Sequence, residues 1–364
     1  MRTILIAHNY TENSFAAMSY HLAHHLADVG NRVVFISHRP FFKETQIIKK
    51  KKGEIIICSW ATERRPTSFA DIFWFAKIYL RYKPEIVIGH FVGNNISILF
   101  SKLLSVGKVK TLAYYHTLTN QILIDSNKKK SIQSLLFFRK RLFYKLFCDL
   151  IVCPSEFAKM DLKSFHNVNK GIVVLNPMMD RFVTKDKNIE NTIVISYLGR
   201  LENSKGVLDM INAFIEYKSK NCRSKIVLNI AGSGSKSKEV AQLISGLESI
   251  SFLGNLPYNE IDGYLNKSHF AIIPSKFDAF NMVGIEAMMN GTPLLISNTT
   301  GLSNYLLDGR ECFKFDSTIN SMISLFNQIE KKEFNYEEMS NSARATYLEL
   351  FSLESYYKSI SKIL

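Results

Sequence analysis

Two carboxylates, Asp278 and Glu286, lie eight positions apart in the stretch "PSKFDAFNMVGIEAMMNGTP" of residues 274–293, with no other charge between them. Carboxylate oxygens accept hydrogen bonds from hydroxyl groups, so two acids can hold two ends of a ligand that is rich in hydroxyls. The segment "MVGIEAMMN" has helix-forming content, with Asn281 as its N-cap and glycine and proline behind it as stop signals. Glu286 would then also favour the helix dipole, an interpretation that requires no ligand.

Two cations, Arg200 and Lys205, bracket the loop of "ISYLGRLENSKGVLDMINAF", which reads as strand, polar loop and helix. Gly199 allows a tight turn after the strand, and we expect the helix to begin near Val207. A guanidinium, an ammonium and helix amides that converge on one point would suit a diphosphate. The alternative, that both cations are solvated loop residues, is equally consistent with this stretch alone.

A second loop, in "LNIAGSGSK", follows another expected strand. Its Gly232 and Gly234 would let backbone amides approach a ligand, which makes Gly232 a further candidate for binding. A GxG pattern is common in turns after strands, so it carries little weight by itself.

Short runs rich in Ile and Val must position these loops. They do not alternate with polar residues, which is typical of strands buried on both faces of a parallel sheet. The runs are "TILIAH", "RVVFIS", "EIIICS", "EIVIGHF", "KTLAYYH", "LIVCPS" and "GIVVLN", then, after a polar segment, "TIVISYLG", "KIVLNIAG", "SISFLG", "FAIIPS", "PLLIS" and "CFKF". Amphipathic stretches between them, such as "FAAMSYHLAHHLADVG" with Gly30 as its stop, predict helices.

This alternation predicts an α/β protein with two Rossmann-like, doubly wound domains that face a cleft. We expect the first domain at residues 1–176, a linker at 177–191, the second domain at 192–340, and helices at 341–364 that cross back to the first domain. Open α/β sheets bind ligands at the carboxyl ends of their strands, where the loops described above are placed.

The composition, 46% hydrophobic and 12% aromatic, describes a globular protein, and 364 residues suffice for two domains. The formal charge of +14 favours an anionic partner: a phosphorylated substrate, a nucleic acid or an acidic membrane surface. No stretch resembles a fold that reads nucleic acid, so we expect no such partner. No apolar run of about 18 residues could span a bilayer, and no leader precedes the first strand, so we expect a protein of the reducing cytosol.

The order of the motifs resembles that of the retaining GT-B glycosyltransferases of family 4, also called group 1, of the bacterial surface-polysaccharide type. "GRLENSKG" is followed by the two-acid stretch, in which Asp278 and Glu286 keep the family's seven intervening residues. "IVCPSEFAKMDL", "VLNPMMDRF", "AGSGS" and "FLGNLP" also follow the family's order. The resemblance therefore covers nearly the whole chain.

The resemblance implies a role for each candidate in the second domain. Arg200 and Lys205 would bind the diphosphate of a nucleotide-sugar donor and stabilise the charge that grows on it as the glycosidic bond breaks. Glu286 would hold the ribose hydroxyls, and Asp278 would contact the transferred sugar. Backbone amides of four consecutive residues would assist: Phe280, Asn281, Met282 and Val283.

The first domain would bind the acceptor. His116, at the end of "TLAYYH", is similar to the family's histidine near the reacting centre; without the resemblance it reads as a satisfied histidine at a strand end. His90 in "VIGHF" is a weaker candidate of the same kind. The paired glycines of the family's opening loop are replaced here by Asn13 and Ser14, on the acceptor side.

Three departures lie in the two-acid stretch itself. The family's first acid is usually glutamate, and here it is Asp278, which is one methylene shorter. The glycines that flank the following Phe in the family are replaced by Ala279 and Asn281. These changes alter the sugar pocket more than the residues that would bind the diphosphate.

The family needs no bound metal, and the sequence contains no DxD motif and no cluster of His, Asp and Glu at ligand spacing. We therefore expect no metal and no cofactor, with a nucleoside diphosphate sugar of the UDP or GDP type as substrate. Retention would proceed by attack on the same face of the sugar, with the departing phosphate taking the acceptor's proton.

The stretch "NKKKSIQSLLFFRKRLFYKLFCDL" has apolar residues at helical spacing. Basic residues precede it and interrupt it: Lys128, Lys129, Lys130, Arg139, Lys140, Arg141 and Lys145. A basic amphipathic helix with aromatic residues predicts contact with an anionic membrane through residues 127–147. The alternative is a helix that packs on the sheet with its cations solvated.

We therefore expect a metal-independent retaining hexosyltransferase or other glycosyltransferase. Its acceptor would be a glycan or a lipid-linked molecule, in lipopolysaccharide or capsule assembly on the cytoplasmic face of the inner membrane. Two alternatives remain open. One is a catalytically silent GT-B subunit that positions a partner transferase, which Asp278 and the replaced glycines favour; the other is a sugar-nucleotide epimerase on the same fold, for which no acid/base pair is recognisable.

Overall fold

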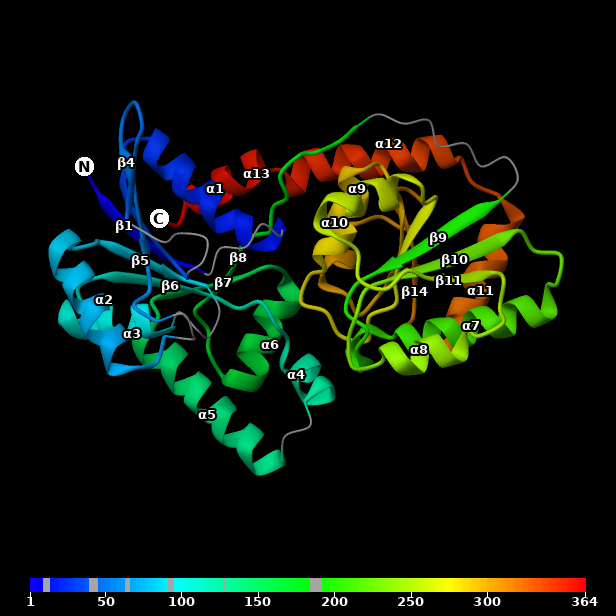
Figure 1. Cartoon of the computed structure of the whole chain (residues 1–364), viewed down its shortest axis with the longest axis horizontal. Helices are drawn as coiled ribbons and strands as arrows, with labels where there is room; N and C mark the ends of the chain where they lie inside the picture. Colours follow the sequence, from blue (N-terminus) through cyan, green and yellow to red (C-terminus); the bar gives the residue numbers. More distant parts are fainter. Residues whose placement is uncertain (9–13, 39–44, 63–65, 91–94, 127–128, 184–191) are drawn as a thin grey trace. The chain divides into compact units, whose positions relative to one another are not determined.

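The computed structural model describes residues 1–8, 14–38, 45–62, 66–90, 95–126, 129–183 and 192–364. The chain forms two compact units (Figure 1). Unit 1 comprises Met1–His116, Lys128–Asn176 and Tyr356–Leu364; unit 2 comprises Thr117–Asn127 and Pro177–Ser355.

The unit limits differ from the expected domain limits in two segments. Thr117–Asn127, which the sequence assigned to the first domain, belongs to unit 2, where Asp125 of this segment bonds to Ser204. Residues 341–355 also belong to unit 2, where Met178 pairs with Ser352; only the last nine residues belong to unit 1.

Unit 1 is built on an eight-stranded sheet in the order β3-β4-β2-β1-β5-β6-β7-β8. All described pairs are parallel except β3 with β4. The strands are β1 Thr3–Ala7, β2 Arg32–Ser37, β3 Gln46–Lys49, β4 Glu54–Ser59, β5 Ile86–Gly89, β6 Lys110–Tyr114, β7 Leu150–Cys153 and β8 Gly171–Val173. The sequence predicted every strand but β3, a mostly exposed edge strand of four residues that carries too few apolar side chains to stand out.

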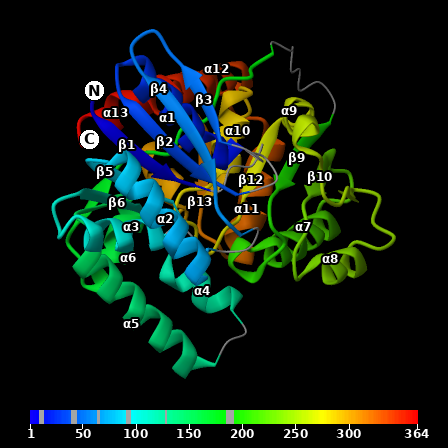
Figure 2. The ribbon, with the colours of Figure 1, turned by 60° about the vertical axis from the view of Figure 1, so that its left-hand side comes forward.

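The helices of unit 1 fall in two groups: those of one group share a core with the strands, and those of the other pack on one another in sequence. They are α1 Ser14–Asp28, α2 Phe69–Tyr82, α3 Asn95–Leu104, α5 Lys130–Phe147, α6 Glu156–His166 and α13 Leu353–Ser361. α1 and α13 bury Leu22 and Tyr356 in one core with the strands, and α1 ends just before Gly30 as predicted. α2 packs on α3, α3 on α5, and α5 on α6 (Figures 1 and 2).

Unit 2 is built on a six-stranded parallel sheet in the order β11-β10-β9-β12-β13-β14. The strands are β9 Ile193–Leu198, β10 Ile226–Ala231, β11 Ile250–Phe252, β12 Phe270–Ile273, β13 Leu294–Ser297 and β14 Cys312–Phe315. The sequence predicted all six. The sheet of unit 2 is parallel and that of unit 1 is parallel except at β3, so the prediction of an α/β fold with two parallel-sheet domains is confirmed.

Helices enclose the sheet of unit 2. They are α4 Thr119–Asp125, α7 Val207–Lys220, α8 Ser237–Leu243, α9 Tyr258–Asn266, α10 Met282–Met289, α11 Ile319–Lys331 and α12 Tyr336–Thr346, with short 3-10 turns at Asn203–Lys205 and Gly301–Tyr305 and a π-helical turn at Tyr347–Phe351. Phe214 of α7 and Phe326 of α11 meet edge to face over the sheet, with ring centres 5.3 Å apart. The start of α7 at Val207 confirms the sequence prediction.

The strand order explains where ligands should bind. In unit 2 the chain runs outward from β9 to β10 and β11, then returns to place β12 on the other side of β9. The loops after β9 and β12 therefore leave the sheet side by side at a topological switch point, where open α/β sheets bind ligands. In unit 1 the same reversal lies between β1 and β5.

Candidate functional site

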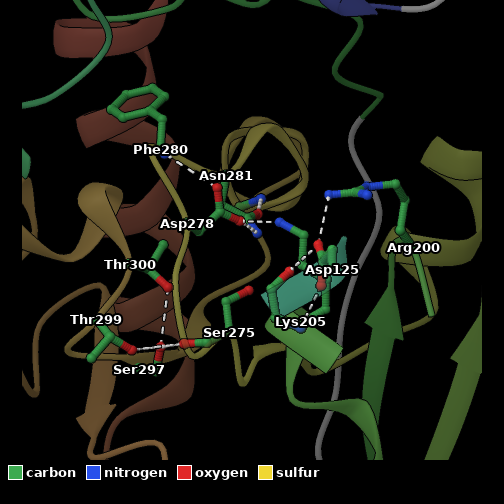
Figure 3. Close-up of polar contacts among 12 residues, drawn as sticks. Asp125, Arg200, Lys205, Ser275, Asp278, Phe280, Asn281, Ser297, Thr299 and Thr300 are labelled. Carbon is green, nitrogen blue, oxygen red and sulfur yellow. Dashed lines mark hydrogen bonds and ion pairs between the residues drawn. The ribbon is translucent and has the colours of Figure 1, made fainter. Parts of the chain in front are cut away.

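The loop after β9 is braced by two carboxylates, of which Asp125 is shown in Figure 3. Asp125 of α4 accepts hydrogen bonds from the amide of Ser204 at 3.0 Å and from its hydroxyl at 2.7 Å. Glu202, inside the loop, accepts hydrogen bonds from the amide and the hydroxyl of Ser235 at 3.0 and 2.6 Å. The loop that carries Arg200 and Lys205 is therefore held in shape without a ligand.

The loops after β9 and β12 also bind each other through their backbones. The carbonyl of Ser204 accepts a hydrogen bond from the amide of Lys276 at 2.8 Å. Gly206 has a φ of +67°, and a Cβ there would lie 2.1 Å from the carbonyl oxygen of Pro274. Only glycine fits this crossing, so the glycine of "NSKG" is explained by packing.

Hydroxyl groups from the end of β13 and the residues just after it fix the loop after β12 (Figure 3). The carbonyl of Ser275 accepts hydrogen bonds from Ser297 Oγ at 2.6 Å and from Thr299 Oγ1 at 2.7 Å. The carbonyl of Asp278 accepts a hydrogen bond from the amide of Gly301 at 2.9 Å. Asp278 is thus presented from a rigid loop.

Lys205 and Asp278 form an ion pair at the centre of this group. Lys205 Nζ lies 2.5 Å from Asp278 Oδ2, and only 14% and 9% of the two side chains are exposed. Burial by itself would raise the pKa of Asp278, but the Lys205 ammonium and hydrogen bonds from Asn281 and Phe280 outweigh it and lower the pKa below its usual value. Asp278 is therefore an anion at neutral pH and can accept hydrogen bonds from hydroxyl groups.

Asn281 links Asp278 to α10. Its side-chain oxygen accepts a hydrogen bond from the amide of Gly284 at 2.8 Å, which confirms it as the N-cap, and its side-chain nitrogen donates to Asp278 at 2.9 Å. Asn281 has a φ of +82°, in the region that favours glycine, and Asn tolerates it better than most residues. The resembling family has glycine at this position.

Two amides near the start of α10 have partners within the chain, and one of them, that of Phe280, was expected to be open to a ligand. The amide of Gly284 donates to Asn281, and the amide of Phe280 donates to Asp278 Oδ1 at 3.2 Å. Both bonds form because the backbone turns back toward the side chains of Asp278 and Asn281, which lie in the same loop. Met282 and Val283, which begin α10, lie between these two positions.

Arg200 is the exposed cation of the group. More than half of its side chain is exposed, and its Nη2 lies 3.9 Å from Asp125 Oδ2. Arg200, Asp125, Ser204, Lys205 and Asp278 therefore form one continuous polar cluster at the ends of β9 and β12 (Figure 3). Arg200 and Lys205 are cations in the same turn, which is the arrangement that a diphosphate requires.

Glu286 lies in a second charged group. It is buried on α10, with Oε1 3.6 Å from Nη2 of Arg181. Arg181 also forms a two-point ion pair with Asp262 at 2.8 and 3.1 Å. The described ion pair of Glu286 is thus with Arg181, a residue that no sequence pattern had indicated.

Gly232 is explained by the close approach of two backbones. It has a φ of +136°, and a Cβ there would lie 1.8 Å from the carbonyl oxygen of Gly199. Its amide, which we expected to approach a ligand, donates to the carbonyl of Gly254 at 2.7 Å.

Three histidines lie together at the strand ends of unit 1. The His8 and His90 rings stack with centres 4.4 Å apart, and His116 follows at 5.7 Å from His90. All three are desolvated by burial, which lowers the pKa of His8 to about 3 and the pKa values of His90 and His116 well below the usual value. They are neutral imidazoles at pH 7, and His8 Nδ1 lies 2.5 Å from Ser19 Oγ.

The predicted acceptor-side positions cannot be placed in the same way. Asn13 lies outside the described residues, and Ser14 is the first residue of α1, where only the backbone is described. Within the described parts of both units, no three His, Cys, Asp or Glu side chains are grouped so that they could hold a metal ion.

No sequence pattern had indicated a role for Asp125, Glu202, Arg181 or His8. Asp125 acts on a loop 79 positions away, and no local pattern marks an acid with such a distant partner. His8 could have been found, since it ends its strand run in the same way as His90 and His116.

Two units, each built on an α/β sheet, form the GT-B fold, and solved structures with this fold match the whole chain. Sucrose-phosphate synthase from Thermosynechococcus elongatus matches with a TM-score of 0.79 at 14% identity, over 100% of this chain and 98% of that one. Anabaena HepE, solved in complex with UDP and glucose, matches with a TM-score of 0.72 at 15% identity, over 100% of this chain and 99% of that one. Identities this low show the fold alone.

Sequence comparison assigns the family. Residues 180–346 match the family described as "Glycosyl transferases group 1", and residues 16–181 match "Glycosyltransferase Family 4". Residues 180–346 are therefore of the group 1 glycosyltransferase type and residues 16–181 of the family 4 type, and the two matches together run along most of the chain.

Curated relatives match over shorter stretches. A glycogen synthase of Mycobacterium tuberculosis is 33% identical over 117 residues, 31% of this chain and 28% of that protein. A lipopolysaccharide 1,2-N-acetylglucosaminetransferase of Salmonella typhimurium is 25% identical over 231 residues, 56% of this chain and 59% of that protein. The match thus spans less than two thirds of the length of either relative.

Proposed function

We propose that this protein transfers a sugar, with retention of anomeric configuration, from a nucleoside diphosphate donor to a glycan or lipid-linked acceptor. The observation that carries the proposal is the polar cluster at the switch point of unit 2, where Arg200 and Lys205 share one turn beside the ionised Asp278. A cationic turn next to a carboxylate suits a ligand with an anionic end and a hydroxyl-bearing end. A nucleoside diphosphate sugar has both.

The contacts suggest how the donor is held. The diphosphate would bind Arg200 and compete with Asp278 for Lys205, and both cations would stabilise the charge that develops on the departing phosphate. Asp278, released from Lys205, would accept hydrogen bonds from the transferred sugar, with the first backbone amides of α10 beside it. Glu286 would hold the ribose, and Arg181 would orient its carboxylate.

In unit 1, His116 would face the acceptor. As a neutral imidazole it would offer one N–H donor and one acceptor to sugar hydroxyls, without the charge of an imidazolium. Asn13 and Ser14 would line the acceptor side. The departing phosphate would take the acceptor's proton, so the reaction would need no metal and no cofactor.

The donor is proposed to be of the UDP or GDP type, and the neighbour solved with UDP and glucose supports the first of these. A role in lipopolysaccharide or capsule assembly is supported by the Salmonella relative. No helix in the described part of the chain is long and apolar enough to cross a membrane. We place the protein on the cytoplasmic face of the inner membrane, held there by residues 127–147.

Donor hydrolysis tests the proposal. The purified protein should hydrolyse one UDP- or GDP-sugar slowly without acceptor, and the released sugar should keep its anomeric configuration by NMR. Lys205→Ala should abolish the hydrolysis. A silent subunit would hydrolyse no donor, and an epimerase would convert the donor into its epimer without releasing the nucleotide; either result would contradict the proposal.

A further inference from the structure

Helix α5 carries its apolar residues on the outside. The side chains that turn toward the rest of unit 1 include Gln133 and Tyr144, which are buried. Six large apolar side chains on this helix are exposed: Ile132, Leu135, Leu136, Phe138, Leu142 and Leu146. Leu135 is 58% exposed and Leu146 is 66% exposed. A surface helix of a globular protein has the opposite arrangement, with its apolar stripe on the core.

Polar and aromatic contacts hold α5 in this orientation. Lys140 Nζ lies 4.3 Å from the ring centre of Tyr115, and the Tyr115 hydroxyl donates a hydrogen bond to Asp161 of α6. Burial lowers the pKa of Lys140 to about 8, so this lysine belongs to the inner face although the sequence groups it with the surface cations. The exposed leucines are therefore not needed to attach α5 to unit 1.

The neighbouring helices extend the same surface. α2 exposes Phe69 and Phe73, which are 81% and 68% accessible, and α3 exposes Leu103, with Val106 just beyond its end. α2 packs on α3 and α3 on α5, so the three helices form one layer of unit 1 (Figures 1 and 2). We call the exposed side of this layer the basic apolar face. Its exposed apolar residues are Phe69, Phe73, Leu103, Ile132, Leu135, Leu136, Phe138, Leu142 and Leu146.

All charged side chains of α5 are positive. Lys130–Phe147 contains no acid, and Arg139, Arg141 and Lys145 lie within or beside the stripe of exposed apolar side chains. Apolar side chains interleaved with arginine and lysine match a surface that offers both hydrocarbon and phosphate. That combination is found at the headgroup level of an anionic bilayer.

We propose that the basic apolar face lies on an anionic lipid bilayer, with its Leu and Phe side chains between the headgroups and its cations on lipid phosphates. A second copy of the chain fits less well, because a two-fold contact would oppose the arginines and lysines of both copies. The inference deepens the membrane contact in the proposed function by naming the face that makes it. It requires no transfer activity.

Vesicle sedimentation of the full-length protein without donor tests the apolar part of the proposal. The protein should bind vesicles of phosphatidylcholine with about 30% phosphatidylglycerol and should bind pure phosphatidylcholine weakly. Leu142→Glu with Leu146→Glu should lower the partition coefficient at least about tenfold, since each change places an acid among anionic headgroups. Leu307→Glu with Leu348→Glu is the matched control, because these leucines of unit 2 are similarly exposed, and it should bind like the parent.

A second pair of variants tests the charge. Arg139→Gln, Arg141→Gln and Lys145→Gln together should weaken binding to the anionic vesicles about a hundredfold, at roughly tenfold or less per charge. Lys238→Gln, Lys267→Gln and Lys331→Gln change three exposed lysines of unit 2 and should reduce it far less.

Three results would overturn the proposal: no binding by the parent protein, equal losses in the variants and their controls, or a dimer in gel filtration that the leucine variants break apart. The last would show that a second copy covers the face. Donor hydrolysis measured without vesicles keeps this outcome separate from a failure of the proposed activity, because the four leucines and six cations lie outside the donor cluster.

Discussion

At the scale of single residues, Lys205 has two competing anionic partners. In the structure its ammonium is bound to Asp278, and the proposed donor would offer a diphosphate to the same group. Breaking a nearly buried ion pair is costly unless the new partner is equally charged. A nucleoside diphosphate meets that condition better than a nucleoside monophosphate, which offers a single phosphoryl group.

Two of the three departures from the resembling family in this loop, Asp278 and Asn281, are in direct contact. Asp278 is shorter than the usual glutamate, and Asn281, which replaces a glycine, donates a hydrogen bond from its side-chain Nδ2 to Asp278 Oδ2 at 2.9 Å. Asp278→Glu and Asn281→Gly should each lower the unfolding free energy, by roughly 1–2 kcal/mol. The double variant should lose less than the sum, by on the order of 1 kcal/mol, because glycine makes room for the longer acid.

Urea unfolding of the parent, both single variants and the double variant measures this coupling. Asn281→Ala is a useful control, since alanine removes the same hydrogen bonds but is strained at a φ of +82°. Strict additivity of the two single effects would show that the two positions are independent.

The buried histidines predict that unit 1 is sensitive to acid. Eight of the nine histidines lie in the segments of unit 1, and burial lowers the pKa of His8 to about 3. Between pH 3 and the usual pKa of 6.5, the unfolded chain binds more protons at His8 than the folded chain does. The unfolding free energy of unit 1 therefore decreases as the pH falls below about 6.5. The slope is roughly 1.4 kcal/mol per pH unit for each fully buried imidazole.

Hydrogen exchange at pH 7 and pH 5 can separate the two units. Peptides from β1 and β5 should lose protection at pH 5, while peptides from β9 and β12 should keep theirs. The pKa of Asp278 lies below its usual value, so unit 2 should lose stability from this group only at a lower pH. His8→Asn should reduce the loss in unit 1. Equal loss in both units would contradict the assignment.

At the scale of elements, the loop after β9 depends on α4, a helix that is remote in the sequence. Asp125 accepts two hydrogen bonds from Ser204, each worth about 0.5–1.5 kcal/mol net. Asp125→Ala should therefore lower the unfolding free energy by about 2 kcal/mol and raise the KM for the donor, because Arg200 and Lys205 lose their fixed turn.

Asp308→Ala is the matched control for this change. Asp308 is an exposed residue shortly before β14 and accepts a hydrogen bond from the amide of Lys314 at 2.8 Å. This variant should leave the KM for the donor unchanged. If both variants raised it equally, the brace by Asp125 would have no special role in donor binding.

Buried strands and the starts of capped helices could be predicted from the sequence, because each depends on residues close together in the chain. The limits of β2, β4 and β14 follow their Ile- and Val-rich or aromatic runs, and Asn281 caps α10 as expected. The exposed edge strand β3 has no such signal. The grouping of α4 with unit 2 depends on a distant hydrogen bond, which no local pattern records.

At the scale of the whole molecule, the two sheets and the family could be predicted because the motif order runs along nearly the whole chain. The partners of the site residues could not. Asp125 and Arg181 reach the site through contacts 79 and 105 positions apart along the chain, and the engaged amides of Phe280 and Gly284 depend on how one loop folds back. The inward position of Lys140 likewise depends on tertiary packing rather than on the helical pattern.

The most direct test of the donor site is the difference in thermal stabilisation between a nucleoside diphosphate and its monophosphate. With ligand at 100 times its Kd, UDP or GDP should raise the melting temperature of the parent protein by about 5 °C or more, and UMP or GMP at the same concentration should raise it much less. Arg200→Gln, which alters an exposed side chain, should remove most of that difference. Equal protection by diphosphate and monophosphate, or an undiminished difference in Arg200→Gln, would contradict the account.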